Sequence, residues 1–173
     1  MRTLIAYFSR AGENYFGGSI KNITVGNTEI CAGLIKDFLD ADLFKIEMKQ
    51  PYSDQYRECV EQAKVDFAEN NRPELINYPE NMGDYDTIIL GYPNYCGTIP
   101  MAVATFLEFF DTSGKKILPF CTNEGSGMGK SEETIKALCP DADVRKGKSI
   151  MGGQAKSSKT ELEIGRASCR ERV

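Results

Sequence analysis

Short apolar runs along the chain alternate with segments whose apolar residues recur at helical spacing. The run at 87–90 is typical of a strand that is buried on both faces, whereas Ile30, Leu34 and Phe38 repeat every four residues and predict a helix. Strands are expected at 3–8, 42–48, 87–90, 116–121 and 144–151. Four helices are expected: one that begins near Thr28, one that follows an N-cap at Ser53, one at 100–111 and one at 131–138. Strands that alternate with helices predict a parallel sheet with helices on both faces.

Three of these strands end in loops that are rich in glycine and polar residues. The first strand is followed by a long loop at 9–26, with a flexible elbow at Gly17-Gly18, and a helix begins just after it. Free N–H groups and the positive end of the helix dipole converge at such a helix start, so this loop predicts a phosphate site. The other two loops, at 91–97 and 122–129, follow the third and fourth strands. Ligand loops after strands one, three and four fit the sheet order 2-1-3-4-5.

Composition and charge narrow the class of protein. The chain has 173 residues, enough for one domain, and a net charge of -4, which argues against nucleic acid or an anionic membrane as a partner. No apolar stretch is long enough to span a membrane, and the first residues lack the pattern of a signal peptide, so we expect a cytoplasmic protein with reduced cysteines. Because the sequence contains no histidine, Ser-His-Asp catalysis and histidine-ligated metals are excluded.

The C-terminal segment departs from this pattern. Residues 158–161 read Ser-Lys-Thr-Glu, a capping box that predicts a last helix, but Gly165 and a polar, arginine-rich end follow. Residues 163–173 resemble translated sequencing adapter, although a remnant of an expression vector is the other explanation. We therefore expect a domain at 1–162 whose last helix is truncated, followed by a non-native tail at 163–173. In the natural protein an amphipathic helix should continue from this point.

The loop motifs, in this order, resemble those of the flavodoxins over nearly all of residues 1–162. They are most similar to the short flavodoxin-like proteins of anaerobic bacteria, whose insertion after the second strand resembles residues 51–59. The stretches that carry the resemblance are Tyr7-Phe8-Ser9-Arg10-Ala11-Gly12, Gly26-Asn27-Thr28-Glu29, Gly91-Tyr92-Pro93-Asn94-Tyr95-Cys96-Gly97-Thr98 and Pro119-Phe120-Cys121-Thr122-Asn123-Glu124-Gly125-Ser126-Gly127. This resemblance implies an α/β fold: a flavodoxin-like three-layer sandwich with a five-stranded parallel sheet of order 2-1-3-4-5 and helices on both faces.

The resemblance also implies FMN as the cofactor, held by three loops. The phosphate loop would contain Ser9, Arg10, Ala11, Asn27 and Thr28. The two loops beside the flavin ring would contain Pro93, Asn94, Tyr95, Cys96 and Gly97, and Thr122, Asn123, Glu124, Gly125, Ser126 and Gly127. Three features depart from the family: residues 13–25 interrupt a loop that is usually compact, Ala11 replaces a common phosphate-binding threonine, and Tyr95 and Cys96 stand where a tryptophan often stacks on the ring.

Several residues in these loops have a second interpretation. Tyr95 is either a ring-stacking residue or a structural surface tyrosine, and Cys96 is more often a small filler than a redox thiol. The stretch 125–131 resembles a nucleotide-binding P-loop, but Glu124 stands where that motif requires glycine. A phosphoacceptor signalling domain would need an aspartate at the end of the third strand, where Asn94 stands.

The preferred hypothesis is an FMN-binding electron carrier that acts between redox partner proteins, as a monomer or weak homodimer. The flavin supplies the chemistry, so no side chain is expected to act as a catalytic acid or base. An FMN-dependent NAD(P)H or quinone oxidoreductase on the same fold is the first alternative. A binding module that has kept the fold and lost the flavin is the second.

If Glu124 lies beside the flavin ring, its charge should affect the reduction potential of the flavin. The other interpretation, a solvated loop carboxylate with no such effect, is about equally compatible with the sequence. One negative charge about 10 Å from the ring, at an effective dielectric constant near 20, opposes formation of a reduced flavin anion by roughly 1.7 kcal/mol. That corresponds to a shift on the order of 70 mV for a one-electron couple. Glu124→Gln should therefore raise the potential of the second one-electron reduction in a redox titration, and an unchanged potential would remove Glu124 from this account.

Overall fold

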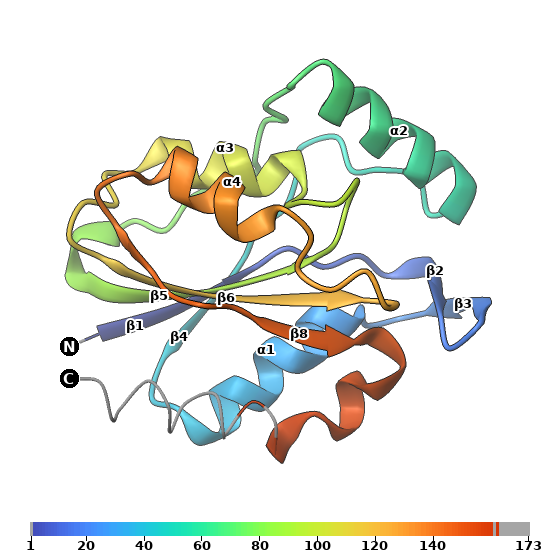
Figure 1. Cartoon of the computed structure of the whole chain (residues 1–173), viewed down its shortest axis with the longest axis horizontal. Coiled ribbons are helices and arrows are strands. Elements are labelled where there is room, and N and C mark those ends of the chain that lie inside the picture. The colour runs from blue at the N-terminus through green and yellow to red at the C-terminus, as the bar shows by residue number, and fades with distance from the viewer. Residues whose placement is uncertain (1, 161, 163–173) are drawn as a thin grey trace.

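The helices of the protein cover both faces of a central parallel sheet. The computed structural model describes residues 2–160 and 162. Helix α1 lies on one face with the turns that follow β8, and α3 and α4 lie on the other (Figure 1). The elements are β1 (Arg2–Tyr7), β2 (Gly12–Phe16), β3 (Ser19–Ile23), α1 (Asn27–Phe38), β4 (Asp42–Lys45), α2 (Tyr56–Ala68), β5 (Tyr85–Pro93), α3 (Met101–Phe109), β6 (Lys116–Asn123), α4 (Ser131–Leu138), β7 (Asp143–Val144) and β8 (Lys148–Met151), with 3₁₀ helices η1 (Met82–Asp84) and η2 (Gly152–Ser157).

The strand order confirms the flavodoxin-like sheet expected from the sequence. The strands run β4-β1-β5-β6-β7, all in parallel, and β8 also pairs with β6. In terms of the five predicted strands this is the order 2-1-3-4-5, with the fifth position divided between β7 and β8. At the division, the N–H of Gly147 donates to the Glu132 carboxylate of α4 at 3.0 Å instead of to a neighbouring strand.

One segment predicted to be a loop is an antiparallel hairpin. Strands β2 and β3 pair from Gly12↔Ile23 to Phe16↔Ser19, and the chain turns at Gly17-Gly18. Both turn glycines have positive φ angles, 61° and 88°, as a two-residue hairpin turn of the favoured kind requires. Two glycines between runs that contain aromatic and β-branched residues were the signal for this hairpin, and reading them as a flexible elbow was wrong.

Alternating residues of β1 enter two separate cores. Leu4 and Ala6 pack with the side chains of α3 and α4, whereas Ile5 and Tyr7 pack with those of α1. All four are buried, which confirms that this strand is covered on both faces. Leu162, the last residue described, is buried in the core on the α1 side.

The predicted last helix lies partly outside the described residues. Lys159, Thr160 and Leu162 are helical, and the Leu162 N–H bonds the Ser158 carbonyl at 3.0 Å. The Ser158 hydroxyl donates to the Ala155 carbonyl at 2.6 Å, while Glu161 of the capping box and the predicted tail at 163–173 lie outside the described part. Within the described residues, no helix combines the length and the apolar character that a membrane crossing would require.

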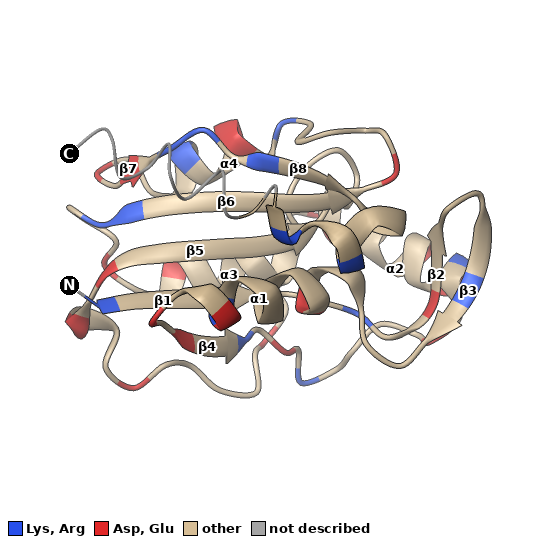
Figure 2. Ribbon diagram, turned by 90° about the horizontal axis from the view of Figure 1, so that it is seen from below, with Lys and Arg blue, Asp and Glu red and all other residues tan. Residues whose placement is uncertain are grey.

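Charged residues lie at the end of the sheet opposite the hairpin, where β1, β4 and β5 begin (Figure 2). The Arg2 guanidinium contacts the carboxylates of Asp42 and Asp84, at 2.8 and 3.3 Å. The Tyr85 hydroxyl donates to Asp42 at 2.6 Å, and this bond together with Arg2 lowers the pKa of the Asp42 carboxyl. These exposed contacts join the starts of β1, β4 and β5. The ligand loops lie at the opposite, carboxyl ends of the strands.

Gly91 in β5 provides a test of this packing. A Cβ atom there would lie 2.1 Å from Cζ of Phe120, its buried neighbour on β6, so Gly91→Ala should lower the free energy of unfolding by about 1–3 kcal/mol. Gly33→Ala in α1 is the matched control, because no atom lies within 4 Å of its added Cβ, and it should raise that free energy by about 0.5–1 kcal/mol. Urea denaturation followed by circular dichroism measures both, and equal effects would contradict the packing at Gly91.

Candidate functional site

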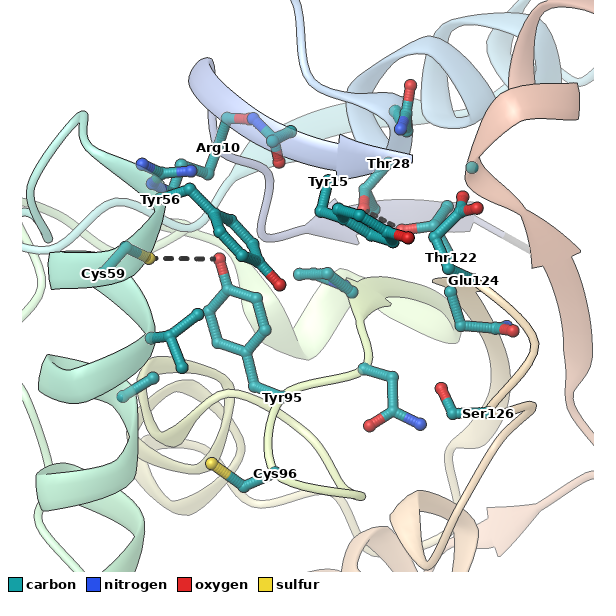
Figure 3. A pocket seen from close by; sticks show the side chains of 18 of the residues that line it. Arg10, Tyr15, Thr28, Tyr56, Cys59, Tyr95, Cys96, Thr122, Glu124 and Ser126 are labelled. Atoms are coloured by element: carbon teal, nitrogen blue, oxygen red, sulfur yellow. Dashed lines mark hydrogen bonds between the residues drawn. The ribbon is translucent and has the colours of Figure 1, made fainter. Parts of the chain in front are cut away.

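A cavity of about 360 Å³ lies at the carboxyl ends of β1, β5 and β6, between the hairpin and α2 (Figure 3). Twelve of the sixteen residues assigned to the cofactor from the sequence line it: Ser9, Arg10, Asn27, Thr28, Pro93, Asn94, Tyr95, Cys96, Thr122, Asn123, Glu124 and Ser126. The other four, Ala11, Gly97, Gly125 and Gly127, belong to the same loops but not to the cavity lining. The structure thus brings together three loops that are far apart in the sequence.

The start of α1 forms one end of the cavity. Its N-cap is Gly26, which supplies no side-chain cap, and the Ser9 hydroxyl accepts the N–H of Glu29 at 3.1 Å. The N–H groups of Asn27 and Thr28 have no acceptor among the described residues. A Cβ on Gly26 would lie 2.2 Å from Oγ of Ser9, so only glycine allows this loop to pass so close. Unpaired donors at the positive end of a helix are suited to an anion.

Two buried hydroxyl groups connect α1 to the centre of the sheet. Oγ1 of Thr28 lies 2.8 Å from Oγ1 of Thr122 at the end of β6. Both side chains are buried, and the hydrogen bond between them gives each hydroxyl a polar partner. The first turn of α1 is therefore held against β6, beside the cavity.

The loop after β5 is a tight turn at residues 95–98. Tyr95 and Thr98 exchange two backbone hydrogen bonds of 3.0 Å, and Cys96 and Gly97 between them have φ angles of 54° and 78°. The Gly97 carbonyl accepts the N–H of Lys130 at 2.7 Å, which ties this turn to the segment before α4. Gly97 therefore shapes the loop rather than facing the cavity.

The loop after β6 is shaped by the side chain of Asn123. Its Oδ1 accepts the N–H groups of Gly125 and Gly127, both at 3.0 Å. Its Nδ2 donates to the Ser149 hydroxyl of β8 at 2.8 Å, and Asn94 from the neighbouring loop donates to the Gly127 carbonyl at 3.1 Å. The two ring-side loops predicted from the sequence thus form one connected surface.

Tyr95 combines a structural role with a place in the cavity lining. Its hydroxyl lies 3.9 Å from Sγ of Cys59 in α2 (Figure 3). Its ring meets that of Phe8 edge-on, with centroids 5.9 Å apart. Burial raises the pKa of the Tyr95 hydroxyl well above its usual value. Burial also raises the pKa of the Cys59 thiol, and partial desolvation raises that of the more exposed Cys96 thiol, so all three groups are protonated at neutral pH.

Two further aromatic side chains line the cavity, and sequence reasoning did not assign them to the site. Tyr15 of the hairpin and Tyr56 of α2 have ring centroids 6.2 Å apart and planes inclined by 33° (Figure 3). The remaining unassigned lining residues are Asn14, Cys59, Val60, Ala63, Lys64 and Gly152. Tyr15 was missed because its segment was read as a loop. Tyr56 was missed because it lies in a helix, outside the three loops that carry the family resemblance.

The Arg10 side chain is hydrogen-bonded to backbone carbonyls on one side of the cavity. Its Nε and Nη2 donate to the Ser53 carbonyl at 3.1 and 2.7 Å, and its Nη1 donates to the Glu13 carbonyl. The guanidinium is thus directed toward the base of the hairpin and the segment before α2, away from the start of α1 (Figure 3). Each of these three nitrogen atoms donates to a carbonyl oxygen, while Nη1 and Nη2 each carry a second N–H. The assignment of Arg10 to the phosphate loop stays a prediction.

Comparisons with known proteins agree with this architecture. A sequence model described as flavodoxin matches residues 2–163. A candidate flavoprotein from Bacteroides uniformis is 24% identical, with a TM-score of 0.75 over 94% of this chain and 97% of that one, and another from Bacteroides eggerthii is 25% identical, with a TM-score of 0.69 over 94% and 98%.

A flavoprotein from Lactobacillus acidophilus, solved in complex with FMN, is 17% identical, with a TM-score of 0.67 over 94% of this chain and 98% of that one. None of the curated proteins compared with the chain matches it. The structural neighbours share the fold, and the family match covers nearly the whole sequence. The chain therefore belongs to the flavodoxin family.

Proposed function

We propose that the protein binds FMN in this cavity and uses it to transfer electrons. The observation that carries the proposal is the pair of unpaired N–H groups at the start of α1, in a cavity that three tyrosine rings also line. Such a cavity suits a ligand with an anionic group at one end and a planar ring at the other. The Lactobacillus acidophilus flavoprotein, which shares the fold, was solved with FMN.

The residues present fit this cofactor. The N–H groups of Asn27 and Thr28, together with the Ser9 side chain, would hold the phosphate. The loops at 93–97 and 122–127 would hold the ring, with Tyr15 and Tyr56 as additional aromatic surface. When bound, FMN supplies reversible one- and two-electron chemistry.

The side chains around the cavity bind, orient and exclude water. The Tyr95 and Cys59 groups remain protonated at neutral pH because burial raises their pKa values, and partial desolvation acts in the same direction on the more exposed Cys96. A protonated thiol is a poor nucleophile, so covalent catalysis by either cysteine is not part of the proposal. The proposed role is electron transfer between redox partner proteins in the cytoplasm.

A second candidate function is the reduction of a small acceptor such as a quinone. The observation that favours it is the extension of the cavity along α2, where Val60, Ala63 and Lys64 line it beyond the three loops. A planar molecule bound against this helix would lie beside the ring site. The two candidates differ in whether the reduced protein passes electrons to a protein or to a small molecule.

The phosphate site predicts that the protein distinguishes FMN from riboflavin. FMN should bind with quenched fluorescence, and riboflavin, which lacks the phosphate, should bind at least about tenfold more weakly because the donors at α1 then have no anion. Fluorescence titration measures both affinities. Equal affinity for the two flavins would mean that the phosphate does not bind at the start of α1. Absence of binding by both flavins would refute the proposal.

Turnover assays separate the carrier from the reductase. A carrier should accept electrons from dithionite or a reductase protein and show no steady oxidation of NADH or NADPH when a quinone is added. The reductase should show saturable oxidation with the quinone, and Ala63→Phe, which fills the α2 side of the cavity, should then raise KM for the quinone several-fold. Val65→Phe on the exposed side of α2 is the control.

A further inference from the structure

The tip of the hairpin β2–β3 rests against the start of η2, and Glu124 connects the two. The N–H of Gly17 in the hairpin turn donates to Oε2 of Glu124 at 3.0 Å. The N–H of Gly153 in η2 donates to Oε1 of the same carboxylate at 3.3 Å. One side chain from the loop after β6 thus joins two segments that are far from each other in the sequence.

The surroundings of Gly152 show how closely these segments meet. A Cβ atom on Gly152 would lie 2.6 Å from Oε1 of Glu124, 2.9 Å from Nδ2 of Asn27 and 3.3 Å from Cβ of Phe16. The hairpin, the start of α1, the loop after β6 and η2 therefore converge on a space that only glycine fits.

The base of the hairpin is attached by a different and larger set of contacts. Arg10 reaches the carbonyls of Ser53 and Glu13, and the N–H of Glu13 donates to the Asp54 carbonyl at 2.9 Å. The Glu13 carboxylate accepts the N–H of Tyr56 at the start of α2, also at 2.9 Å. The base is therefore fixed to the protein by several bonds.

The tip depends on far fewer contacts than the base. Across residues 2–160 and 162, Glu124 is the only side chain from outside the hairpin that hydrogen-bonds residues 16–20. Tyr15 lies next to this tip and lines the cavity. Loss of the Glu124 contacts would let the tip swing away about its fixed base and carry Tyr15 with it.

We propose that Glu124 is a positioning residue that holds the hairpin tip closed over the cavity and thereby slows loss of the bound cofactor. The cofactor part of this inference rests on the proposed function. Hydrogen bonds to a carboxylate are stronger than those to a neutral acceptor. Glutamine at this position keeps one acceptor oxygen and presents an NH₂ group to the other backbone donor, so it cannot make both bonds.

Amide hydrogen exchange of the flavin-free protein, followed by NMR, tests the closed tip directly. In Glu124→Gln the amides of Gly17 and Gly153 should exchange about tenfold faster than in the wild type. Glu132→Gln is the matched control, because Glu132 also accepts a glycine N–H, that of Gly147, at a distance from the hairpin. It should accelerate exchange at Gly147 and leave Gly17 unchanged. Equal Gly17 exchange in the wild type and Glu124→Gln would overturn the proposal.

The rate of FMN dissociation tests the consequence for the cofactor. Glu124→Gln should release FMN about tenfold faster than the wild type, measured by the return of flavin fluorescence after dilution, and Glu132→Gln should not. A carboxylate that acted through its charge alone would repel the phosphate, so its neutralisation would slow release. Slower or unchanged release would overturn the role in cofactor retention. Failure of the wild type to bind FMN would refute the proposed function and this retention role, while the exchange measurement would still decide whether Glu124 holds the tip.

Discussion

The close crossing of residues 9 and 10 over Gly26 is the contact on which the rest of the site depends. It places the Ser9 hydroxyl on the N–H of Glu29 and sets the position at which α1 begins. The first turn of α1 is then joined to β6 through the hydroxyl pair of Thr28 and Thr122. Because a side chain on residue 26 would collide with this crossing, one glycine determines where the open end of the helix meets the carboxyl ends of the strands.

Beside this polar end the cavity has a wall of neutral groups. Tyr95 and Cys59 lie in contact there, with the hydroxyl 3.9 Å from Sγ, and both are neutral at pH 7 because burial raises their pKa values. Neutral aromatic and thiol groups provide packing surface and exclude water without supplying or removing protons at pH 7. Such a wall suits a bound group that brings its own reactivity, as FMN does.

Much of this architecture could be predicted from the sequence, because strand and helix periodicity and the positions of the three loops are local signals. These signals identified the sheet order, and the resemblance of the three loops to those of the flavodoxins implied most of the cavity lining. The orientation of Arg10 and the contribution of Tyr56 could not be predicted, since both depend on contacts between an insertion and distant segments. The hairpin with Tyr15 was missed because Gly17-Gly18 is equally compatible with a flexible loop and with a tight turn. The break in the fifth strand lies at Gly147, whose N–H makes another long-range contact, with Glu132 of α4.

The contacts at the base of the hairpin have a consequence for transferring this cavity to another protein. The segment that enters the hairpin and the segment leading to α2 lie far apart in the sequence, yet Arg10 and Glu13 of the first are bonded to Ser53, Asp54 and Tyr56 of the second. Removing the second segment alone would leave a charged side chain and backbone donors without their partners. A protein engineer who wishes to transplant this cavity onto another scaffold must therefore move both segments together.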